Sequence, residues 1–278
     1  MEKIKPNCKK TKPCSECGKC KPKKVNTTEE NINIEKFKAK CEKKLRFLES
    51  FGPNINDLVN LVEPIALSLN SDIDDENLNR IIEHPKRLLY HANEILKINN
   101  IVMDKNINTQ ELKIIIMFHD IGKCIKFKKY NADMKKDHHI FSSIILQTAM
   151  TYMGFDSSKI SDLCWDVYDH NDRKMPREKC LERSILYQIL LDVDKIDELD
   201  VYGMIIKSIV KGYENKVKRN NIINQEDLKK WIIEFTKNND IYENLLLDES
   251  KLYYTSLVKD NVSKLLDMID YTRKDDLF

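Results

Sequence analysis

The chain has 278 residues, of which 41% are hydrophobic and 33% are charged, and its formal net charge is +2. This composition is typical of a globular protein and excludes a disordered chain, and no apolar run approaches the roughly 20 residues of a membrane-spanning helix. The six glycines are too widely spaced to form a G-x-G-x-x-G or P-loop motif, which excludes a glycine-rich phosphate-binding loop.

The first 26 residues are a separate tract that is rich in lysine, proline and cysteine and nearly empty of large apolar side chains. Nine lysines against two glutamates give residues 1–24 a local charge of +7 and leave about −5 for the remainder, so the body of the protein is not a basic nucleic-acid platform. The tract contains no apolar segment of a secretory signal, and we therefore expect a cytoplasmic protein.

Four cysteines of this tract have the spacing C-x5-C-x2-C-x2-C; they are Cys8, Cys14, Cys17 and Cys20. In a cytoplasmic chain, four thiolates so close together favour a metal site over disulfides. The longer arm of a tetrathiolate zinc site is missing, and so is the Cys-Pro that closes a bacterial iron–sulfur motif. Zinc and an iron–sulfur cluster therefore both stay open. The alternative is a lysine-rich tail with reducible thiols.

Residues 27–80 are expected to form helices that pack on the domain after them. Apolar side chains recur every three or four positions over residues 29–50, and the pattern stops at Gly52, which predicts one amphipathic helix. A second helix is expected over residues 55–69, with an interruption at Pro64.

From residue 80 onward the helical period continues almost everywhere. The expected helices cover residues 80–98, 109–120, 138–153, 157–170, 178–200, 201–219, 225–237 and 250–270. Residues 112–118 are the best strand candidate, but both flanks are helical and no partner strand is evident, so helix is expected here too. The chain is thus predicted to be all-α, with a central bundle over residues 81–203 and a C-terminal helical extension over residues 204–278. The cysteines of the body, Cys41, Cys124, Cys164 and Cys180, are expected to be small apolar core residues.

All six histidines fall within 87 residues of the central segment; they are His84, His91, His119, His138, His139 and His170. The doublet His119-Asp120 ends a very apolar run. Burying such a pair costs several kcal/mol unless it is paired or bound to a metal. The clustering and the doublet together indicate a metal site.

Five motifs follow one another along the central segment. They read His84-Pro-Lys-Arg-Leu-Leu, His119-Asp-Ile-Gly-Lys, Asp137-His-His-Ile-Phe-Ser-Ser, Tyr168-Asp-His-Asn and Leu191-Asp-Val-Asp-Lys-Ile-Asp. In this order they make residues 81–203 resemble the HD superfamily of metal-dependent phosphohydrolases. The resemblance implies an HD-domain helical bundle with a divalent cation as cofactor.

The resemblance also implies specific roles for residues of this chain. The implied ligands of the cation are His84, His119, Asp120 and Asp194. Two imidazoles with two carboxylates suit Mn²⁺, Fe²⁺, Co²⁺, Ni²⁺ or Zn²⁺ better than Ca²⁺. Such a cation would activate water and neutralise phosphoryl charge, and Lys123 could place its ammonium against a phosphate. Asp120 and Lys123 are therefore the expected catalytic residues.

Two features of the site stay open at this point. His138 and His170 stand where binuclear members of the family hold a second ion, so one ion or two are expected. Asp192 is the alternative to Asp194 as the last ligand, because residues two apart on a helix point to different sides. Asp197 is expected to be a cap or a salt-bridge partner.

Three further residues are expected to have supporting roles. His91 and His139 are interpreted as hydrogen-bonded core residues, although His91 shares a helix face with His84 and could support it from behind. Arg87 is expected to pair with Glu83.

The leading functional hypothesis is hydrolysis of a phosphate ester or anhydride, with a small phosphorylated substrate such as a nucleotide and no membrane partner. One alternative is a non-catalytic module that binds a nucleotide or senses redox state. A second alternative is a nuclease that uses residues 1–24 as a basic arm on nucleic acid.

Overall fold

The computed structural model describes residues 32–99, 101–171, 175–197 and 241–275, together with Glu226, Lys229, Lys230 and Ile233. The chain divides into two units, residues 1–32 and residues 33–278, and every described helix lies in the second. The cysteine tract and the helix expected over residues 201–219 lie outside the described residues, as does most of the helix expected over residues 225–237.

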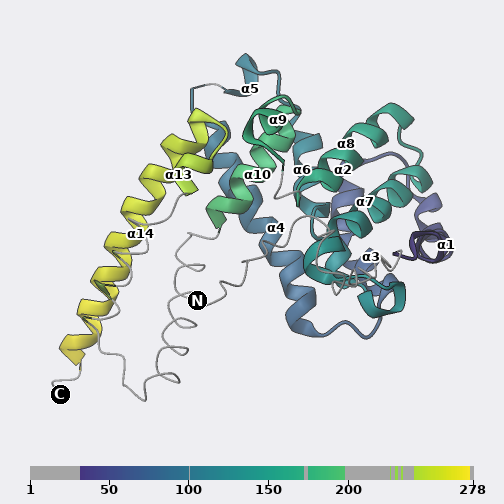
Figure 1. Ribbon diagram of the computed structural model, residues 1–278, viewed down its shortest axis with the longest axis horizontal. Helices are drawn as coiled ribbons and strands as arrows, with labels where there is room; N and C mark the ends of the chain where they lie inside the picture. Colours follow the sequence, from purple (N-terminus) through teal and green to yellow (C-terminus); the bar gives the residue numbers. More distant parts are fainter. Residues whose placement is uncertain are drawn as a thin grey trace, which may run out of the picture. The chain divides into compact units, whose positions relative to one another are not determined.

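Helices make up all the regular structure of the described residues, which confirms the predicted all-α class (Figure 1). The α-helices are α1 (Ile34–Leu45), α2 (Ile55–Asn60), α3 (Val62–Leu69), α4 (Asp75–Leu96), α5 (Ile101–Asp104), α6 (Thr109–Phe118), α7 (Met134–Tyr152), α8 (Ser157–Asp169), α9 (Arg177–Leu181), α10 (Ile185–Asp197), α13 (Ile241–Asn244) and α14 (Asp248–Asp275). The 3₁₀ helices are η1 (Arg46–Ser50), η2 (Ile121–Cys124) and η3 (Phe127–Tyr130). Across the described ranges, no helix combines the length and the apolar character that crossing a bilayer requires.

The helix predicted over residues 29–50 begins at Ile34 and ends as a 3₁₀ helix. The Asn33 side chain accepts the N–H of Lys36 and caps α1, so the helix begins at Ile34. Its last part is the 3₁₀ helix η1. Four residues of the expected apolar stripe are completely buried, namely Phe37, Cys41, Leu45 and Leu48, and its first two, Ile32 and Ile34, are partly buried.

The break in the second predicted helix lies at Leu61, so its placement at Pro64 was wrong. Pro64 is the third residue of α3. The backbone N–H groups of a first helical turn have no partner inside the helix, so a proline there removes no hydrogen bond.

Residues 112–118, which were the best strand candidate in the sequence, belong to the central helix α6. It packs against α2, α4, α8 and α10. Leu112 and all of residues 114–118 are buried, which confirms the helix expected there. The second half of α6 is apolar on every side and is covered on every side, whereas Thr109 and Gln110 in its first turn are exposed. The doublet His119-Asp120 forms the turn directly after it.

The next element, η2, approaches α7 closely at Gly122. The Gly122 N–H donates to Ser142 Oγ at 2.8 Å. A Cβ at this position would lie 2.2 Å from the carbonyl oxygen of His138, which is shorter than any side chain tolerates. Because only glycine fits this contact, Gly122 allows the His119-Asp120 turn to lie against α7.

The single helix predicted over residues 178–200 is in fact two helices, α9 and α10. Residues 182–184 separate them, and Ser184 Oγ accepts the N–H of Tyr187 as a cap of α10. The same hydroxyl donates to Asp166 Oδ2 at 2.6 Å, and Arg183 binds the other Asp166 oxygen at 3.2 Å. These bonds to α8 hold the break in place.

The described C-terminal helices pack back on the core, where the first part of α14 packs against α4 and α10 and the rest leads away from them (Figure 1). Asp192 of α10 is fully buried, and its carboxylate accepts the N–H of Leu246 at 2.8 Å and that of Leu247 at 3.0 Å. These two residues directly precede α14, so a buried carboxylate anchors the start of that helix.

Candidate metal centre

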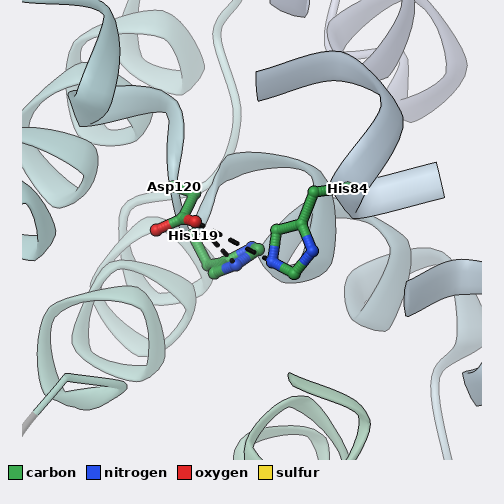
Figure 2. Close-up of side chains that lie close together, drawn as sticks. All are labelled: His84, His119 and Asp120. Atoms are coloured by element: carbon green, nitrogen blue, oxygen red, sulfur yellow. Dashed lines mark ion pairs between the residues drawn. The ribbon is translucent and has the colours of Figure 1, made fainter. Parts of the chain in front are cut away.

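The carboxylate of Asp120 lies at the centre of the candidate site. Figure 2 shows His84 from α4 and His119 from the end of α6 beside one of its oxygens. Asp120 Oδ2 lies 3.5 Å from His119 Nε2 and 3.8 Å from His84 Nε2. These ligand atoms are close enough together to hold one metal ion.

The second oxygen of Asp120 faces another pair of imidazoles. Asp120 Oδ1 lies 3.1 Å from His138 Nε2 and 3.8 Å from His170 Nε2. The two Nε2 atoms are 3.3 Å apart. Asp120, His138 and His170 thus form a second group that could hold a metal ion.

Three of these imidazoles are oriented by their own stretch of backbone. The Nδ1 atoms of His119, His138 and His170 donate to the carbonyls of Ile116, Met134 and Val167 at 2.7, 2.9 and 2.6 Å, three or four residues earlier in each case. A carbonyl oxygen can only accept, so each Nδ1 carries the hydrogen. The Nε2 lone pairs therefore point toward Asp120, which is the orientation that a metal ligand needs.

His84 is oriented by side chains from a distant helix instead. Its Nδ1 bonds Asp197 Oδ2 at 2.9 Å, and its Nε2 bonds Asp194 Oδ1 at 3.2 Å. Arg87 holds the same Asp197 carboxylate through two nitrogens at 2.9 and 3.0 Å. The expected Arg87–Glu83 pair was the wrong assignment, because Asp197 binds Arg87 and Glu83 binds Lys86 at 2.7 Å. Asp197 is the salt-bridge partner that the sequence suggested.

Burial and nearby charges shift the pKa values of His119, Asp120 and His84 in different ways. Burial lowers the pKa of His119 to about 4, which leaves this imidazole neutral with a free lone pair at neutral pH. Burial would raise the pKa of Asp120, but the imidazoles of His119, His138 and His170 together with Lys123 hold it well below its ordinary value. Burial also opposes protonation of His84, yet its bonds to Asp194 and Asp197 raise its pKa to about 9.

The residues present fit a divalent cation. His119 Nε2 is buried, with the side chain only 1% exposed, and it has no hydrogen-bond partner. An unpartnered buried nitrogen is unfavourable unless something else binds it. The facing Nε2 lone pairs of His138 and His170 would likewise repel each other without a cation or proton between them. Mixed nitrogen and oxygen donors are what divalent transition metals prefer.

The acids of α10 point in different directions, as their spacing predicts. Asp194 faces His84, and its side chain is 44% exposed. Asp192 points away from His84 and binds the backbone before α14. Lys123 Nζ pairs with Asp120 Oδ2, and its side chain is 25% exposed. The geometry therefore brings Asp194 and Lys123 to the site and leaves Asp192 out.

The remaining sequence candidates lie elsewhere. His139 packs its ring edge-on against Tyr168, with the ring centroids 5.4 Å apart, and it belongs to neither ligand group. His91 is buried and bonds Tyr253 of α14 through Nδ1 at 2.8 Å, a contact that no sequence signal announced. The body cysteines are buried free thiols, as predicted: Cys41, Cys124, Cys164 and Cys180. Cys8, Cys14, Cys17 and Cys20 lie outside the described residues, so their metal site stays a prediction.

Comparison with known families adds an independent finding. The family model of the HD domain matches residues 81–201, almost the range that the motifs suggest. Comparison with curated proteins and with solved structures found no match. The matched segment includes His84, His119, Asp120 and Asp194, which the structure brings together. Residues 81–201 of this chain are therefore an HD domain, the domain of a superfamily whose members are generally metal-dependent phosphohydrolases.

Proposed function

We propose that this chain hydrolyses a phosphate ester or anhydride of a small phosphorylated substrate, and that the substrate is a nucleotide. The observation that carries the proposal is the arrangement around Asp120. One carboxylate oxygen faces His84 and His119, and the other faces His138 and His170. An HD domain with such an arrangement supports metal-dependent phosphoryl chemistry.

Two divalent transition-metal ions fit this arrangement better than one. His84, His119, Asp120 and Asp194 would hold the first ion, and Asp120, His138 and His170 would hold the second. Asp120 would then be a ligand in both groups, because its two oxygens face the two pairs of imidazoles. A bound cation supplies Lewis-acid chemistry, because it lowers the pKa of coordinated water and neutralises charge on phosphoryl oxygens.

The partly exposed residues of the site would act on the substrate. The Lys123 ammonium is close to Asp120 and a quarter exposed, so it can leave that carboxylate and pair with a phosphoryl oxygen. The half-exposed Asp194 lies beside His84 Nε2 and can orient an approaching water through its second oxygen. The buried residues, above all His119, keep the inner side of the site dry.

A substrate panel tests the proposal. The purified chain is incubated with Mn²⁺, Co²⁺ or Ni²⁺ and with nucleoside monophosphates, nucleoside triphosphates, a dinucleotide diester or p-nitrophenyl phosphate, and the products are quantified by chromatography. We expect hydrolysis of at least one nucleotide that stops with EDTA, returns with the metal, and is absent from a His119→Ala, Asp120→Ala double variant.

Other outcomes would replace the proposal. Equal activity in the wild type and the double variant would remove the site from the reaction. A nucleotide that raises the unfolding temperature without turnover would favour the binding module. Strong, salt-sensitive RNA or DNA binding that is lost on deletion of residues 1–24 would favour the nuclease.

A further inference from the structure

A side chain from outside the HD domain reaches the residues that support His84. Tyr253 belongs to α14, far beyond the matched segment that ends at residue 201. Its hydroxyl lies 2.8 Å from His91 Nδ1, and His91 Nε2 lies 3.7 Å from Asp197 Oδ1. Asp197 in turn binds His84 Nδ1 at 2.9 Å. A chain of contacts therefore runs from α14 to a candidate metal ligand.

The protonation pattern along this chain of contacts follows from the groups at its ends. The His91 side chain is only 1% exposed; its Nδ1 contacts the Tyr253 hydroxyl, and its Nε2 makes no hydrogen bond and faces Asp197 Oδ1. If Nδ1 carried the hydrogen, a bare Nε2 lone pair would face the carboxylate of Asp197, which repels it. The favourable pattern has the Tyr253 hydroxyl donating to Nδ1, with the His91 hydrogen on Nε2 and directed at Asp197.

The position of Tyr253 is itself fixed by the helix that carries Asp197. Asp192 of α10 binds the backbone N–H groups of Leu246 and Leu247, just before α14 begins. Asp197, five residues further along, is the last residue of α10. One helix therefore holds both the start of α14 and the carboxylate that orients His84.

We propose that Tyr253 is a positioning residue for the metal centre. Its hydroxyl sets the tautomer of His91, so that the His91 N–H faces Asp197, and Asp197 holds the His84 ring through Nδ1 so that Nε2 faces Asp120. The C-terminal helix is thereby part of the working metal centre. This inference rests on the proposed role of His84 as a metal ligand.

A conservative substitution isolates the hydroxyl. In Tyr253→Phe the ring stays and the hydroxyl that contacts His91 is lost. The neighbouring buried Tyr254 gives a matched control, Tyr254→Phe, on the same helix. Two properties are measured on the full chain: the His91 tautomer from long-range ¹H–¹⁵N spectra of the metal-free protein, and Co²⁺ affinity from visible absorption in competition with a chelator.

We expect Tyr253→Phe to change the His91 tautomer pattern and to weaken Co²⁺ binding by about threefold to tenfold. This is less than the roughly tenfold to hundredfold typical of a group that bonds a ligand directly, because Tyr253 acts two residues further away. Tyr254→Phe should leave both properties unchanged. In a His91→Leu background, Tyr253→Phe should have no further effect on affinity, because the connection is already broken.

The results separate this inference from the proposed function. A wild type that binds no Co²⁺ would refute the metal centre, and with it this role of Tyr253. A wild type that binds Co²⁺ while Tyr253→Phe keeps its affinity and its tautomer would refute the role of Tyr253 alone. Equal losses in Tyr253→Phe and Tyr254→Phe, or full additivity with His91→Leu, would mean a general packing effect and would also overturn it. If His91→Leu does not fold, the comparison of the two tyrosine variants decides.

Discussion

The two sides of Asp120 are built by different means. On one side, His138 and His170 are each oriented by a backbone carbonyl three or four residues earlier. On the other side, His84 depends on the carboxylate of Asp197, 113 residues further along the chain. Local helix geometry therefore sets the ring orientations of His138 and His170, whereas that of His84 is set only when α10 packs on α4.

Removing the carboxylate that both sides share should have the largest effect. We expect Asp120→Ala to lose both ions and to lower kcat/KM by about a thousandfold or more, since each cation supplies several kcal/mol of charge stabilisation. Elemental analysis and steady-state kinetics measure the two losses. Asp162→Ala, which changes an exposed acid on α8, is the control. Activity within tenfold of the wild type in Asp120→Ala would contradict the central role of this residue.

Removing one imidazole from each side tests whether the two sides bind ions separately. We expect His84→Ala and His170→Ala each to weaken one ion by about a hundredfold or more, since losing a ligand exceeds the loss of its orienting partner. Each variant should retain the ion on the other side, so titration with Mn²⁺ should show one tight site in place of two. Loss of both ions in either variant would mean that the two sides form a single site.

A methyl group added at Gly122 should force η2 and α7 apart. We expect Gly122→Ala to lower the free energy of unfolding by about 3 kcal/mol, because the new Cβ would meet backbone atoms that cannot move alone. Urea unfolding measures this change. Gly52→Ala is the matched control, since a Cβ at Gly52 would meet nothing within 4 Å. A stability equal to that of the control would show that η2 does not need this close approach.

The smallest expected effect comes from weakening the long-range support of His84. We expect Asp197→Asn to lower metal affinity by about tenfold to a hundredfold on the His84 side. Asp166→Asn changes another buried carboxylate bound by an arginine, Arg183, but away from the metal centre. Both variants should lose about 1–3 kcal/mol of stability, and only Asp197→Asn should lose affinity in a Co²⁺ titration. Equal affinities in the two variants would remove Asp197 from the metal centre.

The sequence predicted the parts of the fold that depend on local pattern. The apolar run of α6 was placed correctly as a helix because both of its flanks are helical. The boundaries were less accurate where side chains from other helices decide them. The break at Ser184, for example, is held by Asp166 of α8, and no periodicity in residues 178–200 reveals that partner.

The sequence by itself determined the all-α class, the HD motifs and the candidate ligands, because helical periodicity and motif spacing are properties of contiguous residues. Only the tertiary structure separated Asp194, which faces His84, from Asp192, which anchors the start of α14. Only the tertiary structure joined Tyr253 to His91. Contacts between residues more than 100 positions apart depend on how helices pack. The pattern of side chains along one helix does not reveal which helix packs against it.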